Sequence, residues 1–370
     1  MGSPIRVLHV VVNMNRGGAE TLLMNLYRNI DRSKIQFDFL TCKEGVFDQE
    51  IIELGGKVHR IPYITEVGHS EYIRALKLFF SENPNYKIVH SHMDKMSGFP
   101  LRAAKQAGIP VRIAHSHSTR SEGGIIASTY KWFAGNMITK YATNFVACSK
   151  EAADWLFKHD SKQALILKNG IQSDKFQFSM KKRKENRDKL EVPIDHFAIG
   201  HVGRFSAPKN HFFLLEIFKD FLVLNENAIL LLVGDGPLLP EVKKKAEEME
   251  LSSKVKFLGN RDDVDCVLQT LDLFLFPSLF EGFPVSVMEA QGSGIPCLIS
   301  DCITKDVDLG SELLNFLPLK NKKAWLDKMM VIKNKGFNRN SHAHLLISKN
   351  GYDIKSTSKH IQTFYTTITG

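Results

Sequence analysis

The chain has 370 residues, 43% of them hydrophobic, which is enough for two domains with separate cores. No apolar run approaches the roughly 20 residues that span a bilayer, and the N-terminus shows no secretory signal pattern. Its five cysteines are scattered without metal-type spacing. Their odd number and lack of pattern indicate reduced thiols in a cytosolic protein.

The formal net charge of +9 is unevenly distributed along the chain. Residues 1–190 hold 29 Lys and Arg against 18 Asp and Glu, whereas residues 191–370 hold 20 against 22. A basic half is typical of a protein that binds an anionic membrane face, a phosphorylated substrate or nucleic acid. Nucleic acid is the least favoured, because no zinc-finger spacing, aromatic RNA-binding strand or basic zipper is present. The cationic run at residues 181–184 fits a solvated helix or linker equally well.

An apolar, β-branched run at residues 6–12 predicts a buried strand. It leads into a turn with Gly17 and Gly18 and then into a helix at residues 21–30. Strand, glycine-rich turn and helix are typical of the start of a doubly wound α/β unit. The two glycines allow the backbone to approach a ligand closely, although a tight turn alone would also explain them. The G-x-G-x-x-G dinucleotide motif is absent.

Further strand candidates follow at intervals typical of α/β proteins, with helical segments at residues 70–80 and 96–107 between them. These strand candidates are residues 37–40, 57–61, 88–90, 111–114, 144–147 and 164–167. The alternation predicts a mostly parallel sheet covered on both faces, with ligands bound beyond the carboxyl ends of the strands. The charged segment 180–192 predicts the passage to a second domain.

Histidines follow two of these strands: His90 and His92 after one, His115 and His117 after the next. At the carboxyl ends of strands they are candidate polar contacts for a substrate. Zinc binding is a less favoured alternative, because no Asp, Glu or Cys completes a recognised ligand spacing. A structural role, with the imidazoles bonded to neighbouring backbone, is a third.

A second α/β unit begins with a strand at residues 196–202, which ends in Gly203 and Arg204, with Lys209 in the loop that follows. Two cations and a glycine there suit a diphosphate, because Arg donates bidentate hydrogen bonds and Lys carries a mobile charge. Two exposed surface cations are the alternative. The remaining elements are a helix at 211–222, strands at 228–233, 255–258, 271–276 and 296–300, and helices at 324–332 and 354–368. The strand at 228–233 ends in a turn at Gly234. From residue 313 onward the sequence predicts helix only.

The most informative stretch follows the strand at residues 271–276. It contains Glu281 in a turn and, eight positions later, Glu289 on a helix that begins near Pro284. Free N–H groups at the start of a helix favour an anion such as phosphate. A buried carboxylate needs hydrogen-bond donors, which sugar or ribose hydroxyls supply. The stretch therefore predicts a nucleotide-sugar pocket, and an ordinary strand–loop–helix connection is the alternative.

Taken together, these features resemble the GT-B glycosyltransferases of family 4, a retaining group that uses nucleotide-sugars, and in particular its bacterial exopolysaccharide and capsule enzymes. The resemblance extends over nearly the whole chain. The residues that carry it are Gly17-Gly18-Ala19-Glu20, His115 and His117, Asn169-Gly170-Ile171, Gly203-Arg204 with Lys209-Asn210, Gly234-Asp235-Gly236-Pro237, and Glu281-Gly282-Phe283-Pro284 with Glu289.

The resemblance implies an α/β fold of two Rossmann-like, doubly wound domains that face each other across a cleft. The first, residues 1–190, would bind the acceptor, and the second, residues 191–350, the nucleotide-sugar donor. The C-terminal helix, residues 351–370, would cross back to pack on the first domain.

The resemblance also implies roles for single residues. Arg204 and Lys209 would bind the donor diphosphate, Glu289 the ribose hydroxyls and Glu281 the transferred sugar. The implied donor-binding residues are Gly17, Gly18, Gly203, Arg204, Lys209, Gly234, Glu281, Gly282, Phe283, Pro284, Val285 and Glu289. A histidine at the end of a strand would contact the sugar. Both His115 and His117 fit that position, and His117 is preferred because it lies further beyond the strand.

The implied reaction is the transfer of a sugar from a nucleotide-sugar, with UDP as the favoured nucleotide, to a saccharide or a polyprenyl-diphosphate-linked sugar. It retains the anomeric configuration and needs no metal or other cofactor. The acceptor hydroxyl attacks from the face of the leaving group, while Arg204, Lys209 and the helix start at Pro284 stabilise the developing phosphate charge. A glycosidase pair of carboxylates fits less well, because it leaves these cations and the glycine-rich turn unexplained.

We therefore expect a cytoplasmic enzyme, peripheral at the inner face of the cell membrane, whose N-terminal domain associates with the anionic lipid surface. Two alternatives are a UDP-sugar 2-epimerase of the same fold and a non-catalytic nucleotide-sugar-binding protein.

Overall fold

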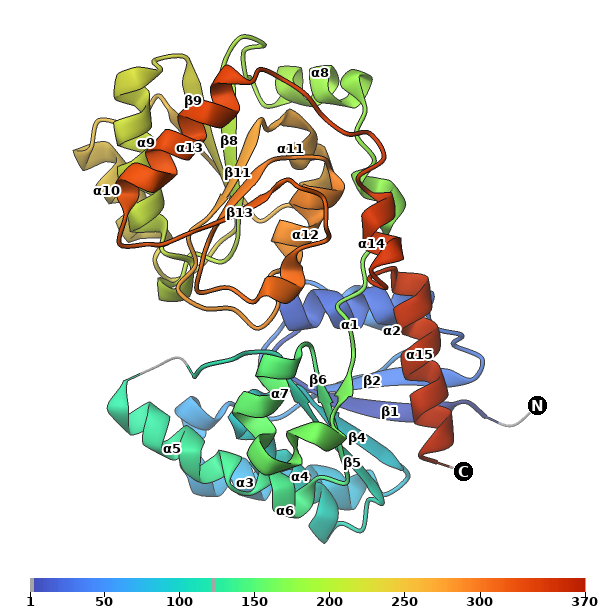
Figure 1. Ribbon diagram of the computed structural model, residues 1–370. Coiled ribbons are helices and arrows are strands. Elements are labelled where there is room, and N and C mark those ends of the chain that lie inside the picture. Colours follow the sequence, from blue (N-terminus) through green and yellow to red (C-terminus); the bar gives the residue numbers. More distant parts are fainter. Residues whose placement is uncertain (1–2, 122–123, 370) are drawn as a thin grey trace. The chain divides into compact units, whose positions relative to one another are not determined.

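A computed structural model describes residues 3–121 and 124–369 (Figure 1). The chain forms two compact units. It passes from the first unit to the second between Ile171 and Gln172 and returns to the first between Asn350 and Gly351. No described helix has the length and apolar character needed to cross a membrane.

The first unit contains a parallel sheet with the strand order β3-β2-β1-β4-β5-β6-β7. Its strands are β1 (Ile5–Val10), β2 (Ile35–Thr41), β3 (Val58–Arg60), β4 (Ile88–Ser91), β5 (Val111–Ser116), β6 (Asn144–Ala147) and β7 (Leu165–Ile166). All seven residues of β2 are buried, as expected for a parallel strand covered on both faces. This is the predicted doubly wound arrangement.

Helices cover both faces of this sheet. They are α1 (Gly18–Asn29), α2 (Asp48–Glu53), α3 (Ile64–Glu82), α4 (Gly98–Gln106), α5 (Ile125–Gly135), α6 (Ile138–Tyr141), α7 (Lys150–Phe157) and α15 (Ile354–Thr367). Short 3₁₀ turns occupy Asp94–Ser97 and Lys158–Gln163. Because successive strand residues point to opposite faces, Val7 packs in the core with residues of α1 and α15, whereas Leu8 packs with residues of α3 and α4.

The second unit contains a parallel sheet with the order β10-β9-β8-β11-β12-β13. Its strands are β8 (Phe197–Val202), β9 (Ala228–Val233), β10 (Val255–Gly259), β11 (Leu273–Phe276), β12 (Cys297–Ser300) and β13 (Leu314–Leu317). Its helices are α8 (Met180–Lys189), α9 (His211–Leu224), α10 (Leu239–Glu248), α11 (Val264–Thr270), α12 (Val285–Gly292), α13 (Lys322–Asn334) and α14 (Leu345–Lys349). Short 3₁₀ turns occupy Ser173–Phe176, Ala207–Lys209 and Lys305–Val307.

One strand contradicts the sequence analysis, which expected only helix beyond residue 313. Strand β13 pairs with β12 from Cys297↔Leu314 to Ser300↔Leu317, at the edge of the second sheet. All four of its residues are only half-buried, and Asn315 interrupts the apolar run. An edge strand of this kind owes its conformation to its neighbour rather than to its own sequence.

Along the chain, the boundary between the units lies between Ile171 and Gln172, before α8, whereas the sequence analysis placed it at residue 190. Helix α8 belongs to the second unit because Arg183 and Arg187 bind Asp272 there, at 2.6 and 2.7 Å. Both guanidinium groups also donate to the backbone carbonyl of Thr270. A buried guanidinium requires such partners. The cationic run at residues 181–184 is therefore partly structural, although Lys181, Lys182 and Lys184 are exposed.

Candidate active site

In the second unit, the turn between β11 and α12 holds Glu281. Its carboxylate accepts a 2.7 Å hydrogen bond from the Lys209 ammonium, and both side chains are less than one-fifth exposed. The residues that follow, Gly282, Phe283 and Pro284, are buried, and Pro284 caps the start of α12. The structure thus brings together two predicted donor-binding residues, one cationic and one anionic. An anionic ligand placed here competes with Glu281 for Lys209.

Backbone contacts fix the loops that carry this pair. The Leu279 N–H donates to the Pro208 carbonyl at 2.8 Å. Asn210, in the left-handed region with φ of 54°, donates from its amide to the Pro277 carbonyl at 3.2 Å. Asn is one of the few residues that tolerates this conformation. The loop after β8 is therefore tied to the loop after β11, and Lys209 is held beside Glu281.

The loops after β8 and β9 also lie against each other. Gly234 has a φ of +135°, and a Cβ there would collide with the carbonyl oxygen of Gly203. The Phe205 N–H donates to the Asp235 carbonyl at 2.9 Å. Gly234 is thus needed for this close backbone approach, whereas a Cβ on Gly203 would meet the side chains of His201 and Lys209. Arg204, between these contacts, is exposed, and its binding to a diphosphate stays a prediction.

Glu289 lies on α12, as predicted. Burial raises the pKa of its carboxyl to about 8, and repulsion from Asp265 adds to the shift. Within the described residues, this carboxyl has neither a hydrogen bond nor an ion pair. The side chain is partly exposed, and a carboxyl that is partly withdrawn from water without a protein partner is suited to bind the hydroxyl groups of a ligand. Its proposed contact with ribose stays a prediction.

In the first unit, Gly17 caps the start of α1 and Gly18 is its first residue. No atom lies within 4 Å of the position that a Cβ on Gly18 would occupy. The three atoms nearest to a Cβ on Gly17 would all belong to the carboxylate of Glu20, the end of a flexible side chain. The start of this helix is therefore open on the Gly18 side, where a ligand can approach the backbone.

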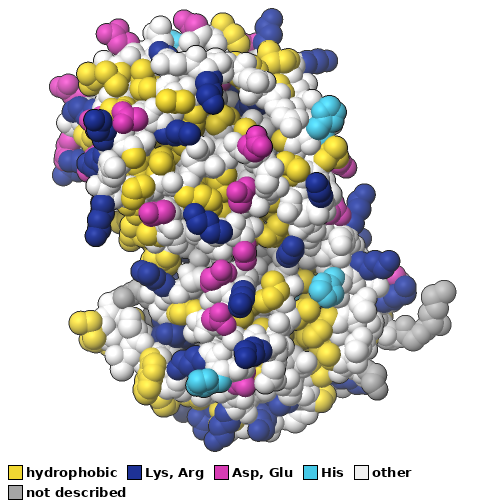
Figure 2. Space-filling model, viewed as in Figure 1, with side chains coloured by type: hydrophobic (Ala, Val, Ile, Leu, Met, Phe, Trp, Pro, Cys, Tyr) yellow, Lys and Arg dark blue, Asp and Glu magenta, His cyan; other side chains and the backbone are white. Residues whose placement is uncertain are grey.

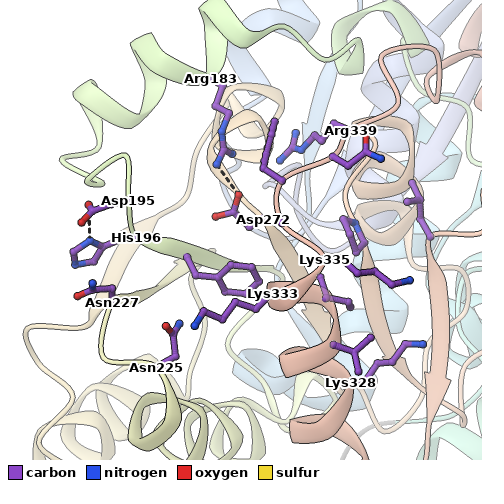
Figure 3. Close-up of a pocket in the computed structure, with 18 of the residues that line it drawn as sticks. Arg183, Asp195, His196, Asn225, Asn227, Asp272, Lys328, Lys333, Lys335 and Arg339 are labelled. Carbon is purple, nitrogen blue, oxygen red and sulfur yellow. Dashed lines mark hydrogen bonds and ion pairs between the residues drawn. The ribbon is translucent and has the colours of Figure 1, made fainter.

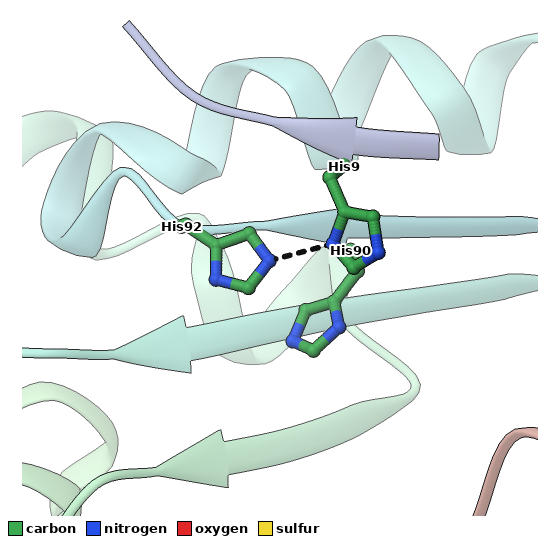
Figure 4. A group of neighbouring side chains, drawn as sticks. All are labelled: His9, His90 and His92. Atoms are coloured by element: carbon green, nitrogen blue, oxygen red, sulfur yellow. Dashed lines mark hydrogen bonds between the residues drawn. The ribbon is translucent and has the colours of Figure 1, made fainter. Parts of the chain in front are cut away.

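The histidines at the ends of β4 and β5 form one cluster, which also includes His9 of β1. Figure 4 shows three of its members, His9, His90 and His92. His9 Nδ1 lies 2.9 Å from His92 Nε2, and His92 Nδ1 lies 2.9 Å from His117 Nε2. His90 Nδ1 lies 2.7 Å from the hydroxyl of Tyr365 on α15. The sequence analysis missed His9, because it lies inside the first predicted strand rather than after it. A polar residue within an apolar strand was the available signal.

The structure separates the two histidines that the sequence left as alternatives. His115 is fully buried, and neither of its ring nitrogens has a hydrogen-bond partner in the described structure. His117 is half-buried, and its backbone N–H donates to the Asp94 carboxylate at 2.8 Å. Only His117 can contact a ligand without rearrangement. Burial lowers the pKa of the His117 imidazole to about 3, so the ring is neutral at physiological pH.

Two groups of three histidines have ring nitrogens within 4.8 Å of one another: His9, His90 and His92, and His92, His115 and His117. Metal ligation requires lone pairs that converge on one point, and these lie in the ring planes. His115 and His117 instead stack, with ring centroids 3.9 Å apart. Both nitrogens of His92 already face other imidazoles. Zinc binding is still the less favoured interpretation of the cluster.

A pocket of about 670 Å³ lies elsewhere on the second unit, at the amino ends of its strands (Figure 3). Asp195 and His196 precede β8, Lys328 and Lys333 belong to α13, and Arg339 follows that helix. None of the predicted donor-binding residues lines this pocket. It is therefore separate from the site that Lys209 and Glu281 form.

Two family models match the chain. Residues 17–168 match a glycosyl transferase 4-like domain, and residues 182–305 match the glycosyl transferases group 1. Each match contains the predicted site residues of one unit. Gly17, Gly18 and His117 fall in the first, and Lys209, Glu281 and Glu289 fall in the second.

Similar proteins and a similar solved structure agree with these matches. The chain is 39% identical over 326 residues to "Putative glycosyltransferase EpsF" of Bacillus subtilis, covering 85% of this chain and 84% of that protein. It is 26% identical over 326 residues to the UDP-Gal:α-D-GlcNAc-diphosphoundecaprenol α-1,3-galactosyltransferase of Escherichia coli, with 82% of each covered. The fold matches the crystal structure of HepE from Anabaena in complex with UDP and glucose, with a TM-score of 0.79 at 18% identity over 98% of this chain and 99% of that one. This chain therefore belongs to the GT-B glycosyltransferases of family 4, among the bacterial enzymes of exopolysaccharide and capsule synthesis.

Proposed function

We propose that this glycosyltransferase is a retaining enzyme that moves a hexose from a UDP-sugar to a polyprenyl-diphosphate-linked saccharide. The observation that carries the proposal is the partly buried ion pair of Lys209 with Glu281, in the same unit as the unpartnered carboxyl of Glu289. The acceptor class is supported by the name of the Escherichia coli relative, and UDP by that name and by the ligands of HepE.

In the proposed donor complex, the diphosphate takes Lys209 away from Glu281, and the exposed Arg204 adds a second cation. Glu281 then accepts hydrogen bonds from hydroxyls of the transferred sugar, while Glu289 accepts them from the ribose. The free N–H groups at the start of α12 face the same negative charge. These groups stabilise the departing diphosphate, so the proposed reaction needs no metal ion.

The proposed transfer breaks the bond between the anomeric carbon and the diphosphate oxygen, and the acceptor oxygen bonds to that carbon from the same face. The departing phosphate takes the proton of the acceptor hydroxyl. No protein nucleophile is required, because in the proposed complex Glu281 accepts hydrogen bonds from the hydroxyls of the transferred sugar.

We further propose that α5 contacts an anionic membrane surface. Ile125 and Ile126 are 87% and 88% exposed, and Trp132 and Phe133 are more than half exposed. Figure 2 shows hydrophobic side chains at the outer edge of the first unit, over the start of α5. Exposed apolar and aromatic side chains on one helix of a basic domain are typical of a segment that enters the lipid interface. A polyprenyl-linked acceptor lies at that interface.

The transfer is tested by incubating the enzyme with UDP-, GDP- and ADP-sugars and an undecaprenyl-diphosphate-linked saccharide, and by measuring free nucleotide and glycolipid product. We expect UDP release that depends on the acceptor, and a product with the donor's anomeric configuration. Lys209→Ala should lower kcat at least about 100-fold, whereas the matched control Lys219→Ala, on the exposed side of α9, should not. A donor epimerised without acceptor would support the epimerase instead, and an inverted product would contradict the retaining mechanism.

Sedimentation with lipid vesicles tests the membrane contact. The wild-type protein should bind vesicles that contain phosphatidylglycerol more strongly than neutral phosphatidylcholine vesicles. Trp132→Ala/Phe133→Ala should lose most of this binding. The control Val223→Ala/Leu224→Ala removes exposed apolar side chains from α9 and should retain it. Equal binding to both kinds of vesicle, or no loss in the α5 variant, would contradict this role.

A further inference from the structure

Three imidazoles of the histidine cluster form a linear chain of contacts that ends at the candidate sugar-binding residue. His9 Nδ1 faces His92 Nε2, and His92 Nδ1 faces His117 Nε2, each at 2.9 Å. Figure 4 shows the first of these contacts between β1 and the end of β4. His9 and His92 are at least nine-tenths buried. Both ring nitrogens of His92 are thus in contact with the other two histidines.

The three rings are neutral, because burial lowers the pKa of each imidazole well below its ordinary value. A neutral imidazole has one N–H donor and one bare acceptor nitrogen. Two hydrogen bonds in series between such rings therefore allow only two arrangements of the ring protons. Either every proton points from His9 toward His117, or every proton points from His117 toward His9.

The inner end of the chain distinguishes the two patterns. His9 Nε2 is buried, and no described residue offers it a hydrogen bond. If the protons point toward His9, this nitrogen carries an N–H with no acceptor. If they point toward His117, it carries only a bare lone pair. Orphaned buried N–H groups are rarer in proteins than acceptors that lack a donor. The protons therefore point from His9 through His92 to His117.

We propose that His92 is a positioning residue that holds His117 in the tautomer with its proton on Nδ1. In this pattern His92 Nδ1–H donates to His117 Nε2, so the outer nitrogen of the half-buried His117 ring presents an N–H. A free imidazole side chain favours the opposite tautomer, with the proton on Nε2. The neighbouring histidines thus impose the less common form. The inference rests on the proposed function only in naming a sugar oxygen as the acceptor of this N–H.

The tautomer decides what His117 can do in the reaction. With Nε2 occupied by His92 and Nδ1 protonated, the ring has no free lone pair and cannot remove a proton from the acceptor hydroxyl. It can only donate a hydrogen bond to an oxygen of the ligand. This leaves the departing phosphate oxygen as the base, in agreement with the proposed transfer.

Long-range ¹H–¹⁵N correlation spectra of protein labelled with ¹⁵N-histidine test the inference directly, because the ¹⁵N shifts of a neutral ring identify the protonated nitrogen. The His117 signals are assigned as those that disappear in His117→Gln. We expect protonated Nδ1 and bare Nε2 for His117 in the free enzyme. Protonated Nε2 would overturn the inference. No substrate is needed, so the result stands whether or not the proposed transferase activity is found.

Two substitutions at His92 separate positioning from general structural support. His92→Asn keeps an amide N–H near the position of Nδ1, whereas His92→Leu has no donor. In the Leu variant, His117 should shift to the Nε2–H tautomer, and kcat should fall about tenfold, as expected for the loss of one hydrogen bond. The Asn variant should restore the Nδ1–H signal and most of kcat. Melting curves of both variants establish that they are folded.

If His117 has the same tautomer in the two variants, and their kcat values are also the same, then His92 does not act through its N–H donor. A Leu variant with the wild-type tautomer would likewise overturn the proposal. If the Leu variant fails to fold, the Asn variant still decides the question. Loss of the His117 Nδ1–H signal in that variant would contradict the proposed role of the His92 donor.

Discussion

The carboxyl of Glu289 allows a quantitative prediction about ligand binding. Its pKa is raised to about 8 by burial. If ribose hydroxyls donate to this carboxyl, the ligand binds its ionised form, and binding must tighten as the pH rises toward 8. The perturbation is therefore a change of pH from 6 to 8, compared between the wild type and Glu289→Gln, which is neutral throughout.

The expected size follows from the ionised fraction of the carboxyl. With a pKa of about 8, this fraction is about 1% at pH 6, about 9% at pH 7 and about one half at pH 8. The apparent Kd equals the intrinsic Kd divided by the competent fraction. The apparent Kd of the wild type should therefore fall about 50-fold between pH 6 and pH 8.

Isothermal titration calorimetry with uridine is the appropriate assay. Uridine carries the ribose but no phosphate, so the phosphate ionisation near pH 6 does not contribute. UDP is then measured in the same series, where the phosphate affects the wild type and Glu289→Gln alike. Two results would refute the assignment of Glu289 to the ribose. One is a wild-type affinity for uridine that does not change between pH 6 and pH 8, and the other is the same dependence of affinity on pH in Glu289→Gln.

Further predictions concern stability. Asp272→Ala leaves Arg183 and Arg187 buried without a counter-ion, so urea unfolding should show a free energy of unfolding that is lower by about 3–5 kcal/mol. In the exposed control Asp195→Ala this free energy should change little, and a similar loss in both variants would contradict the ion-pair argument. Gly234→Ala should destabilise the second unit by more than Gly259→Ala, because both glycines have positive φ but only Gly234 lies against a backbone carbonyl; equal melting temperatures would count against that close approach. Since the folded-state pKa of Glu289 is raised, the wild type's free energy of unfolding should fall relative to Glu289→Gln between about pH 4.5 and pH 8, and a parallel pH profile would argue against the shift.

Much of the fold could be predicted from local sequence because most strands are continuous apolar runs. The strands at residues 144–147 and 228–233 have the predicted bounds. A strand buried on both faces must be apolar along its length, and that signal is local. Strand β13 has no such signal, since its half-buried residues become a strand by pairing with β12.

The boundary between the units could not be predicted for a related reason. A segment rich in Lys and Arg, such as residues 181–189, looks the same whether it lies in a linker or on a helix. Two of these residues are buried because Asp272 lies beside them, 85 or more positions further along the chain. Sequence reveals the charges but not their partners.

For the site, the sequence by itself determined which residue types follow which strands: the glycines after β1 and β8, the cations after β8, the histidines after β4 and β5, and the glutamates around α12. Parallel strands place all their carboxyl ends at one edge of a sheet, so the side chains that follow them are brought into the same region. Only the tertiary structure decided which of them touch. It paired Lys209 with Glu281 across 72 positions, left Glu289 without a partner, buried His115, and joined His9 through His92 to His117. These outcomes depend on strand order and side-chain packing, which no local pattern encodes.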